Sequence, residues 1–213
     1  MFVAKIKRVI VLAILVLLQI VSVHNSFAKD METIYAARAY RVLNRYERKY
    51  GIPKDLLFAI AFQESAKAHN IHKKRIIWPW SVNMSGKTHT FKNKADAVRF
   101  VCRQLRLGHR NIDVGLMQIN LKYHPKAFKS VSDAFDINKN VHYATLFILS
   151  KYDKFKNWDK AVAHYHSGNL KRGMRYHSKV LNIVQNLEEH KSVFQPTKFF
   201  KNRYVRRKTK STI

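Results

Sequence analysis

Residues 55–64 read DLLFAIAFQE, and this stretch decides the fold of the chain. Seven consecutive apolar residues, at positions 56–62, would cover every face of a helix, which predicts a central, buried helix. A buried strand is the alternative for such an apolar run. The Leu and Ala content, and Pro53 as a first-turn residue, favour the helix.

The flanking sequence predicts further helices and one hairpin. Helical patterns cover residues 33–49, 94–105, 138–152, 157–166 and 174–189. Residues 78–91 instead alternate around the turn dipeptide Ser85-Gly86, which predicts a short β-hairpin. A loop containing glycine is expected at residues 108–120. The predicted fold class is therefore mainly α, a helical domain with one small β-hairpin.

Glu64 is informative because the chain has few acids, 13 Asp and Glu against 41 Lys and Arg. No other Glu occurs between Glu47 and Glu188, and Leu57 and Ile60 share the face of Glu64 on the expected helix. Apolar surroundings desolvate a carboxyl group and raise its pKa toward the value that a general acid needs near neutral pH. A structural interpretation stays open, because Glu64 could cap the helix or pair with a cation.

Two later segments carry polar groups suited to sugars. Residues 113–120 read DVGLMQIN, and in an extended loop Gln118 and Asn120 would point the same way. Primary amides donate and accept hydrogen bonds, which suits hydroxyl and N-acetyl groups, although a capped turn would also explain them. Residues 161–169 read AVAHYHSGN, where Tyr165 could hydrogen-bond across a cleft. The two histidines diverge on a helix without an acidic or cysteine partner, so we predict no metal site and no cofactor.

Together these segments resemble the soluble lytic transglycosylase (SLT) family. The counterparts of its three motifs, in the family's order, are Gln63-Glu64-Ser65, Gly115-Leu116-Met117-Gln118-Ile119-Asn120 and Ala163-His164-Tyr165-His166-Ser167-Gly168. The stretch Trp78-Pro79-Trp80-Ser81-Val82-Asn83, with Gly86 and Phe91, is similar to the family's hairpin segment. The resemblance covers residues 35–186. It departs from the common pattern at Ala66-Lys67 and at His164, which would change the rim of the site without removing a catalytic group.

The resemblance implies a lysozyme-like helical domain that cleaves the β-1,4 bond between N-acetylmuramic acid and N-acetylglucosamine in peptidoglycan. By match with the motifs, Glu64 is the catalytic acid and base. Ser65 would support the end of its helix and belongs, with Gln118, Asn120 and Tyr165, to the expected substrate-binding residues. The Tyr165 hydroxyl would hydrogen-bond near the Glu64 carboxyl and hold its orientation.

The reaction that the resemblance implies also fits the small number of acids. A lytic transglycosylase needs one carboxyl group and leaves 1,6-anhydromuramoyl ends, whereas most glycosidases need two carboxylates. Asp113 is the best-placed second acid for a hydrolase, although we favour a loop-capping role for it. The single domain, without wall-binding repeats, is similar to small transglycosylases that open the wall locally for a secretion, conjugation or pilus assembly.

The N-terminus has the order of a secretory signal peptide. Lys5, Lys7 and Arg8 precede an apolar run at 9–18, and Ser26-Phe27-Ala28 offers small residues for signal peptidase. The run is shorter than the roughly 20 apolar residues of a membrane-spanning helix. We therefore expect a signal peptide at residues 1–28 and a transglycosylase domain at residues 29–190. We expect the protein to be exported to the periplasm, with membrane association as a further expectation.

The formal net charge of +28 indicates an anionic partner. For an exported protein, an anionic wall or membrane surface is a better partner than nucleic acid. Residues 191–213 contain basic residues and no acid, which predicts a partly disordered basic tail that binds such a surface. A basic wall-binding or membrane-surface module without catalysis is the alternative function. The single cysteine, Cys102, excludes an intramolecular disulfide and is expected in the core.

Overall fold

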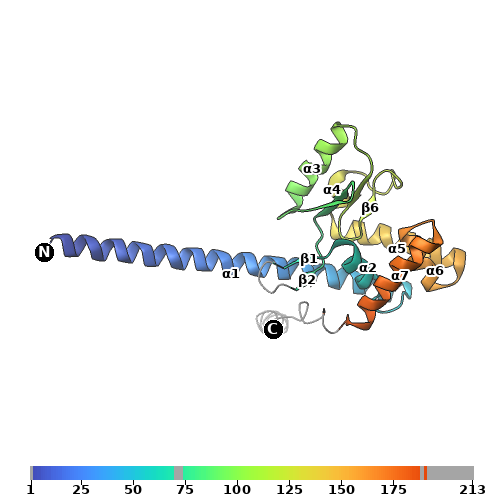
Figure 1. Cartoon of the computed structure of the whole chain (residues 1–213), viewed down its shortest axis with the longest axis horizontal. Helices are drawn as coiled ribbons and strands as arrows, with labels where there is room; N and C mark the ends of the chain where they lie inside the picture. The colour runs from blue at the N-terminus through green and yellow to red at the C-terminus, as the bar shows by residue number, and fades with distance from the viewer. Residues whose placement is uncertain (1, 70–73, 188–189, 191–213) are drawn as a thin grey trace, which may run out of the picture.

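Helices form most of this chain in a computed structural model that describes residues 2–69, 74–187 and 190 (Figure 1). The helices are α1 (Phe2–Tyr50), α2 (Leu56–Ser65), α3 (Lys94–Arg106), α4 (Val131–Ala134), α5 (Ile137–Phe155), α6 (Trp158–His166) and α7 (Leu170–Gln185). The prediction of a mainly helical fold is thus confirmed. The predicted basic tail, residues 191–213, lies outside the described residues.

Helix α1 is much longer than the helix expected at residues 33–49, because it runs without a break from Phe2. Its N-terminal part extends away from the rest of the molecule, as Figure 1 shows. This part contains the proposed signal peptide, whose removal stays a prediction. Within the described residues, no helix combines the length and the apolarity needed to cross a membrane.

Helix α2 forms the centre of the core, as the apolar run predicts. The side chains from Leu57 to Phe62 are all buried, and the helix packs against α1 and α7. The helix begins at Leu56, so the expectation that Pro53 occupies its first turn is wrong. Asp55, at the N-cap, has a left-handed backbone with φ 63°, which separates Pro53 from the helix.

The first turn of α2 is capped by a carboxylate from a different helix. Glu47 of α1 is buried and accepts hydrogen bonds from the backbone N–H groups of Asp55 (3.0 Å), Leu57 (2.8 Å) and Phe58 (3.3 Å). These groups have no partner within a helix, so their satisfaction stabilises its beginning. The cap joins α1 to α2 at the end farthest from Glu64.

The predicted hairpin consists of β3 (Ser81–Met84) and β4 (Lys87–Thr90). Its turn residues, Ser85 and Gly86, have positive φ angles of 53° and 76°, as a tight hairpin turn requires. The sheet is larger than the single hairpin predicted, because β5 (Ile112–Val114) and β6 (Ile119–Asn120) extend it in the order β4-β3-β5-β6. Two strands therefore occupy the expected loop at residues 108–120, where buried side chains at both ends of β5 anchor the strand in the core.

A second, two-stranded ladder follows α2. It pairs β1 (Lys67–Ala68) with β2 (Arg75–Ile76) in antiparallel fashion. Helix α7 packs against both α2 and α6, and Gly173 allows its close approach to α6. A Cβ atom at Gly173 would lie 2.5 Å from the Ala163 carbonyl oxygen, so no larger residue fits there without a shift. This contact brings the buried face of α7 next to the end of α2.

Candidate active site

Glu64 is the penultimate residue of α2, at the end of the most apolar helix in the domain. Its carboxyl group makes no hydrogen bond or ion pair of ordinary geometry with any residue that the structure describes. Burial raises the pKa of Glu64 from 4.5 to about 7, the Tyr176 hydroxyl lowers it, and the charge of Asp113 raises it further. A substantial fraction of Glu64 therefore keeps its proton near neutral pH, as general acid catalysis requires.

Tyr176 of α7 is the neighbour of Glu64 that sequence analysis missed. Its hydroxyl is buried and satisfies no hydrogen bond of ordinary geometry in the described chain, yet it lies near enough to lower the pKa of Glu64. Burial, followed by the charge of Glu64, raises the pKa of Tyr176 well above 10. The side chain belongs to the apolar stripe of α7, with Gly173 and Val180, so the pattern alone suggests a core residue.

Tyr165 lies beside the same carboxyl group at the end of α6. Its hydroxyl donates a hydrogen bond of 2.8 Å to the Met117 carbonyl oxygen, so it is not the donor to Glu64 in this structure. Burial and the charge of Glu64 raise the pKa of Tyr165 well above its ordinary value, which places the two groups close together. The hydroxyl thus ties the segment around Met117 to the neighbourhood of Glu64.

Ser65 turns its hydroxyl back along α2 and donates a 2.9 Å hydrogen bond to the Ala61 carbonyl oxygen. The residue is buried, so in this structure its side chain supports the end of the helix that carries Glu64. Contact between Ser65 and a substrate stays a prediction.

The turn after β5 holds Gln118 in a left-handed conformation with φ 47°. Its amide Nε2 donates to the backbone oxygens of Ser81 (3.0 Å) and Gly115 (2.8 Å). Among the described residues no hydrogen bond occupies its amide oxygen, which leaves this oxygen available to a ligand hydroxyl. Gln118 therefore combines a fixed amide nitrogen with a free acceptor.

Asn120 has a different role from Gln118, because it lies in β6 and its amide is used within the protein. Its Nδ2 donates to the side chains of Asp113 and Asn111, each at 2.8 Å, and its oxygen accepts from the backbone of Lys122 at 3.0 Å. Gln118 and Asn120 therefore do not lie in the extended loop that the sequence analysis predicted, because Gln118 is in a turn and Asn120 is in a strand. Direct sugar contact by Asn120 stays a prediction.

Asp113 lies in β5, opposite Asn120, rather than in a loop. Burial raises the pKa of Asp113, and the hydrogen bond from Asn120 lowers it. The carboxyl group is close enough to Glu64 for its charge to raise the pKa of that residue. One acid without an ordinary hydrogen bond and one acid held by an amide therefore share this site.

Two buried residues that the sequence analysis missed hold the site segments together. The Asn140 side chain accepts from the Met117 backbone N–H at 2.8 Å and donates to the Val114 oxygen at 3.1 Å. Ser81 is fully buried, and its hydroxyl lies 3.3 Å from the Ser65 oxygen. Its own carbonyl accepts from Gln118, so Ser81 connects the end of α2 with the turn after β5.

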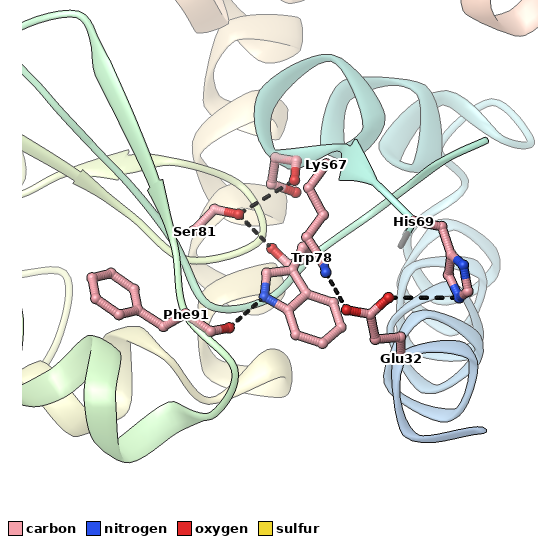
Figure 2. Close-up of polar contacts among 7 residues, drawn as sticks. Glu32, Lys67, His69, Trp78, Ser81 and Phe91 are labelled. Atoms are coloured by element: carbon pink, nitrogen blue, oxygen red, sulfur yellow. Dashed lines mark hydrogen bonds and ion pairs between the residues drawn. The ribbon is translucent and has the colours of Figure 1, made fainter. Parts of the chain in front are cut away.

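Figure 2 shows the polar contacts that surround Ser81 and Trp78. The Ser81 hydroxyl also lies 3.2 Å from the Trp78 carbonyl oxygen, and the Trp78 indole N–H donates to Phe91 at 2.8 Å. The Lys67 ammonium lies 4.3 Å from the centre of the Trp78 ring and pairs with Glu32 of α1. The strands next to Glu64 are thereby fastened to α1.

The described residues contain no group of three or more His, Cys, Asp or Glu side chains arranged to hold a metal ion. Cys102 is free and half-buried on α3, where Ala97 and Val101 are the buried residues, so its predicted place in the core is wrong.

A half-buried, desolvated acid at the end of an apolar helix, beside a small antiparallel sheet, is typical of lysozyme-like glycan-cleaving sites. The sequence profile described as "Transglycosylase SLT domain" matches residues 41–181, so the chain belongs to this family. Members of the family are lytic transglycosylases that act on peptidoglycan, and this chain is an enzyme of that kind. Neither the curated proteins nor the solved structures gave a match.

Proposed function

We propose that this enzyme cleaves the N-acetylmuramic acid–β-1,4–N-acetylglucosamine bond without water and leaves 1,6-anhydromuramoyl ends. The observation that carries the proposal is the environment of Glu64, whose pKa is raised by burial to about 7. Such a group can act first as an acid and then as a base at the same pH. Its position at the end of a buried helix fixes it relative to the surrounding strands.

In the first step, protonated Glu64 donates its proton to the glycosidic oxygen. The bond from this oxygen to C1 of the muramoyl residue breaks, and the N-acetylglucosamine leaves with a free 4-hydroxyl group. The carbonyl oxygen of the muramoyl N-acetyl group supports the positive charge that develops at C1. The Tyr176 hydroxyl, which favours the charged form of Glu64, stabilises the carboxylate at this stage.

In the second step, the 6-hydroxyl group of the same muramoyl residue attacks C1. Its proton passes to the Glu64 carboxylate, which restores the acid and completes the cycle without a net proton change. The attack is intramolecular, so no water needs to be positioned. One carboxyl group therefore suffices, and Asp113, held by Asn120, serves to raise the pKa of Glu64.

Gln118 is the strongest candidate for substrate contact among the predicted amides. Its nitrogen is fixed by two backbone oxygens, so its amide oxygen faces a ligand with little remaining freedom. A sugar hydroxyl or the N–H of an acetamido group would donate to it. Ser65, Asn120 and Tyr165 would shape the site mainly by holding its segments in place.

The proposal also includes the location of the enzyme and its wider role. The leader at residues 1–28 and the net charge of +28 support export to the periplasm and contact with an anionic wall or membrane surface. The similarity of the domain to small transglycosylases supports local opening of the wall for a secretion, conjugation or pilus assembly. These parts of the proposal rest on the sequence.

The test is a digest of purified peptidoglycan by the protein and by its Glu64→Gln variant, analysed by mass spectrometry. Fragments one water lighter than hydrolysis products, absent with the variant, are the expected result. Reducing ends in place of anhydro ends would refute the non-hydrolytic mechanism and point to Asp113 as a second acid. Tight wall binding without any cleavage would favour a binding module.

A further inference from the structure

His166, the last residue of α6, lies flat on the ring of Tyr176, the tyrosine near Glu64. The two ring centres lie 4.4 Å apart and the ring planes differ by 2°, so the rings stack. The imidazole is exposed, whereas the tyrosine is only 5% exposed. His166 therefore forms an outer layer over a ring whose hydroxyl lies near the catalytic acid.

Two contacts join α6 and α7 at this point. A Cβ atom on Gly173 would lie 2.5 Å from the Ala163 carbonyl oxygen, so the two backbones approach closely there. His166 and Tyr176 each follow three residues later on their own helices, and their ring stack is the second contact. The close backbone contact thereby determines where the two rings meet.

The Tyr176 hydroxyl is buried and makes no hydrogen bond of ordinary geometry within the described chain. The other tyrosine of the site is different, because the Tyr165 hydroxyl is fixed by its 2.8 Å hydrogen bond to the Met117 carbonyl oxygen. The direction of the Tyr176 hydroxyl thus depends on how its ring is held. A stacked neighbour holds the ring, because parallel aromatic rings attract each other and a tilted phenol ring would collide with the imidazole.

The electrostatic surroundings suit a neutral ring on Tyr176. Four titratable groups act on the two stacked rings: Arg172, Lys179, Glu64 and Tyr165. Burial, followed by the two cations, lowers the pKa of His166 from its ordinary value of 6.5, so the imidazole is mostly neutral at neutral pH. A positive charge stacked on Tyr176 would favour the charged form of Glu64, which is the opposite of what an acid catalyst needs.

We propose that His166 is a positioning residue, whose ring stacks on Tyr176 and so keeps the Tyr176 hydroxyl directed at the Glu64 carboxyl group. His166 acts through Tyr176 and does not need to touch the substrate. This role rests on the proposed function, because it takes Glu64 as the acid and base of the reaction. The second histidine of the segment at residues 161–169 thereby acquires a role that the sequence pattern does not show.

The test measures the pKa of Glu64 in the full chain without a substrate. With Glu labelled at the carboxyl carbon, an NMR titration shows few signals, because the chain contains five Glu residues, and Glu64→Gln identifies the signal of Glu64. The variants are His166→Ala, which removes the ring, and His166→Phe, which keeps a ring for stacking. The matched control is His177→Ala, because His177 also joins α7 to α6, through a 3.0 Å contact with Asp159 instead of a ring stack.

We expect His166→Ala to raise the pKa of Glu64 by about 0.5, a part of the change that follows the loss of a neutral hydrogen-bond donor. Tyr176→Phe should raise this pKa by about 0.5–1, and adding His166→Ala to Tyr176→Phe should have no further effect. His166→Phe and His177→Ala should leave the pKa of Glu64 unchanged. The high-pH limb of kcat/KM on peptidoglycan should move in the same order.

An unchanged or lowered pKa of Glu64 in His166→Ala overturns this role, and a lowered value would show that His166 acts by excluding water. The role is also overturned if His177→Ala or His166→Phe has the effect of His166→Ala, or if that effect persists in the Tyr176→Phe chain. Thermal unfolding shows whether each variant stays folded. Failure of the proposed function would look different, because hydrolytic ends in a peptidoglycan digest would refute the transglycosylase mechanism and leave the substrate-free titration unaffected.

Discussion

Replacing Glu64 by Gln should stabilise the protein above neutral pH while abolishing cleavage. In the folded state, burial raises the pKa of Glu64 from 4.5 to about 7, whereas in the unfolded chain the carboxyl is in water. The unfolded state therefore releases its proton first as the pH rises, which favours unfolding between these two values. A neutral amide of the same shape has no proton to release, so the variant is free of this penalty.

The size of the effect follows from the two pKa values. Each pKa unit corresponds to about 1.4 kcal/mol, so the difference between 4.5 and about 7 amounts to about 3 kcal/mol once Glu64 is ionised in both states. Below pH 4.5 the carboxyl is protonated in both states, and the gain should vanish. For a chain of this size, about 3 kcal/mol corresponds to roughly 6–12 °C in the unfolding midpoint.

The assay is urea unfolding of the unmodified chain and of Glu64→Gln from pH 4 to pH 9. The exposed carboxylate of Asp153, with 73% of its side chain accessible, provides the matched control as Asp153→Asn. This control should change the free energy of unfolding by less than about 0.5 kcal/mol at every pH. A Glu64→Gln gain that is equal at pH 4 and pH 9, or absent at both, would refute the claim that Glu64 is desolvated.

Three further predictions follow from single contacts. Tyr176→Phe removes the hydroxyl that lowers the pKa of Glu64, so the high-pH limb of kcat/KM should move upward, as a pH–rate profile would show; an unmoved limb would contradict the contact. Glu47→Gln puts an amide in place of an acceptor of three backbone N–H groups, and urea unfolding should show a loss of about 1–3 kcal/mol, whereas a neutral result would rule out the cap. Gly115→Ala would place a Cβ atom 2.4 Å from Asn140 Nδ2 at a φ of 82°, so the variant should fail to accumulate as folded protein by circular dichroism; normal folding would show that the turn adapts.

The helical part of the fold could be predicted because its signals are local. The apolar run of α2 extends over consecutive residues, and a helix that is apolar on every face has to lie in the core. The hairpin turn at Ser85-Gly86 could also be predicted, because this dipeptide is typical of tight turns, and both residues do adopt the positive φ angles that such a turn requires. Glu64 could be singled out because acids are rare in this chain and it follows the apolar run directly.

The rest of the site depends on contacts between segments that are far apart in the sequence. The sequence alone does not show which of these segments come together. Strands β5 and β6 are only a few residues long and were expected to be a loop, because pairing with β3 rather than propensity forms them. Tyr176 lies on an apolar stripe, where a tyrosine looks like any other core residue. The role of Tyr176 can be recognised only in the folded structure, where Gly173 allows α7 to pack close to α6 and the Tyr176 hydroxyl lies near Glu64.

The two glutamates associated with α2 show how one residue type acquires opposite roles. Burial raises the pKa of both Glu47 and Glu64, but Glu47 faces three backbone N–H groups at the beginning of the helix, which favour its charged form. Glu64 lies at the other end, where the carbonyl groups of the last turn form the negative pole of the helix and disfavour a further negative charge. Among the described residues, the group that lowers the pKa of Glu64 is the Tyr176 hydroxyl, a neutral donor. The beginning of α2 is thus capped by a carboxylate from α1 that stabilises the fold, and its end carries a carboxyl group that keeps its proton for transfer.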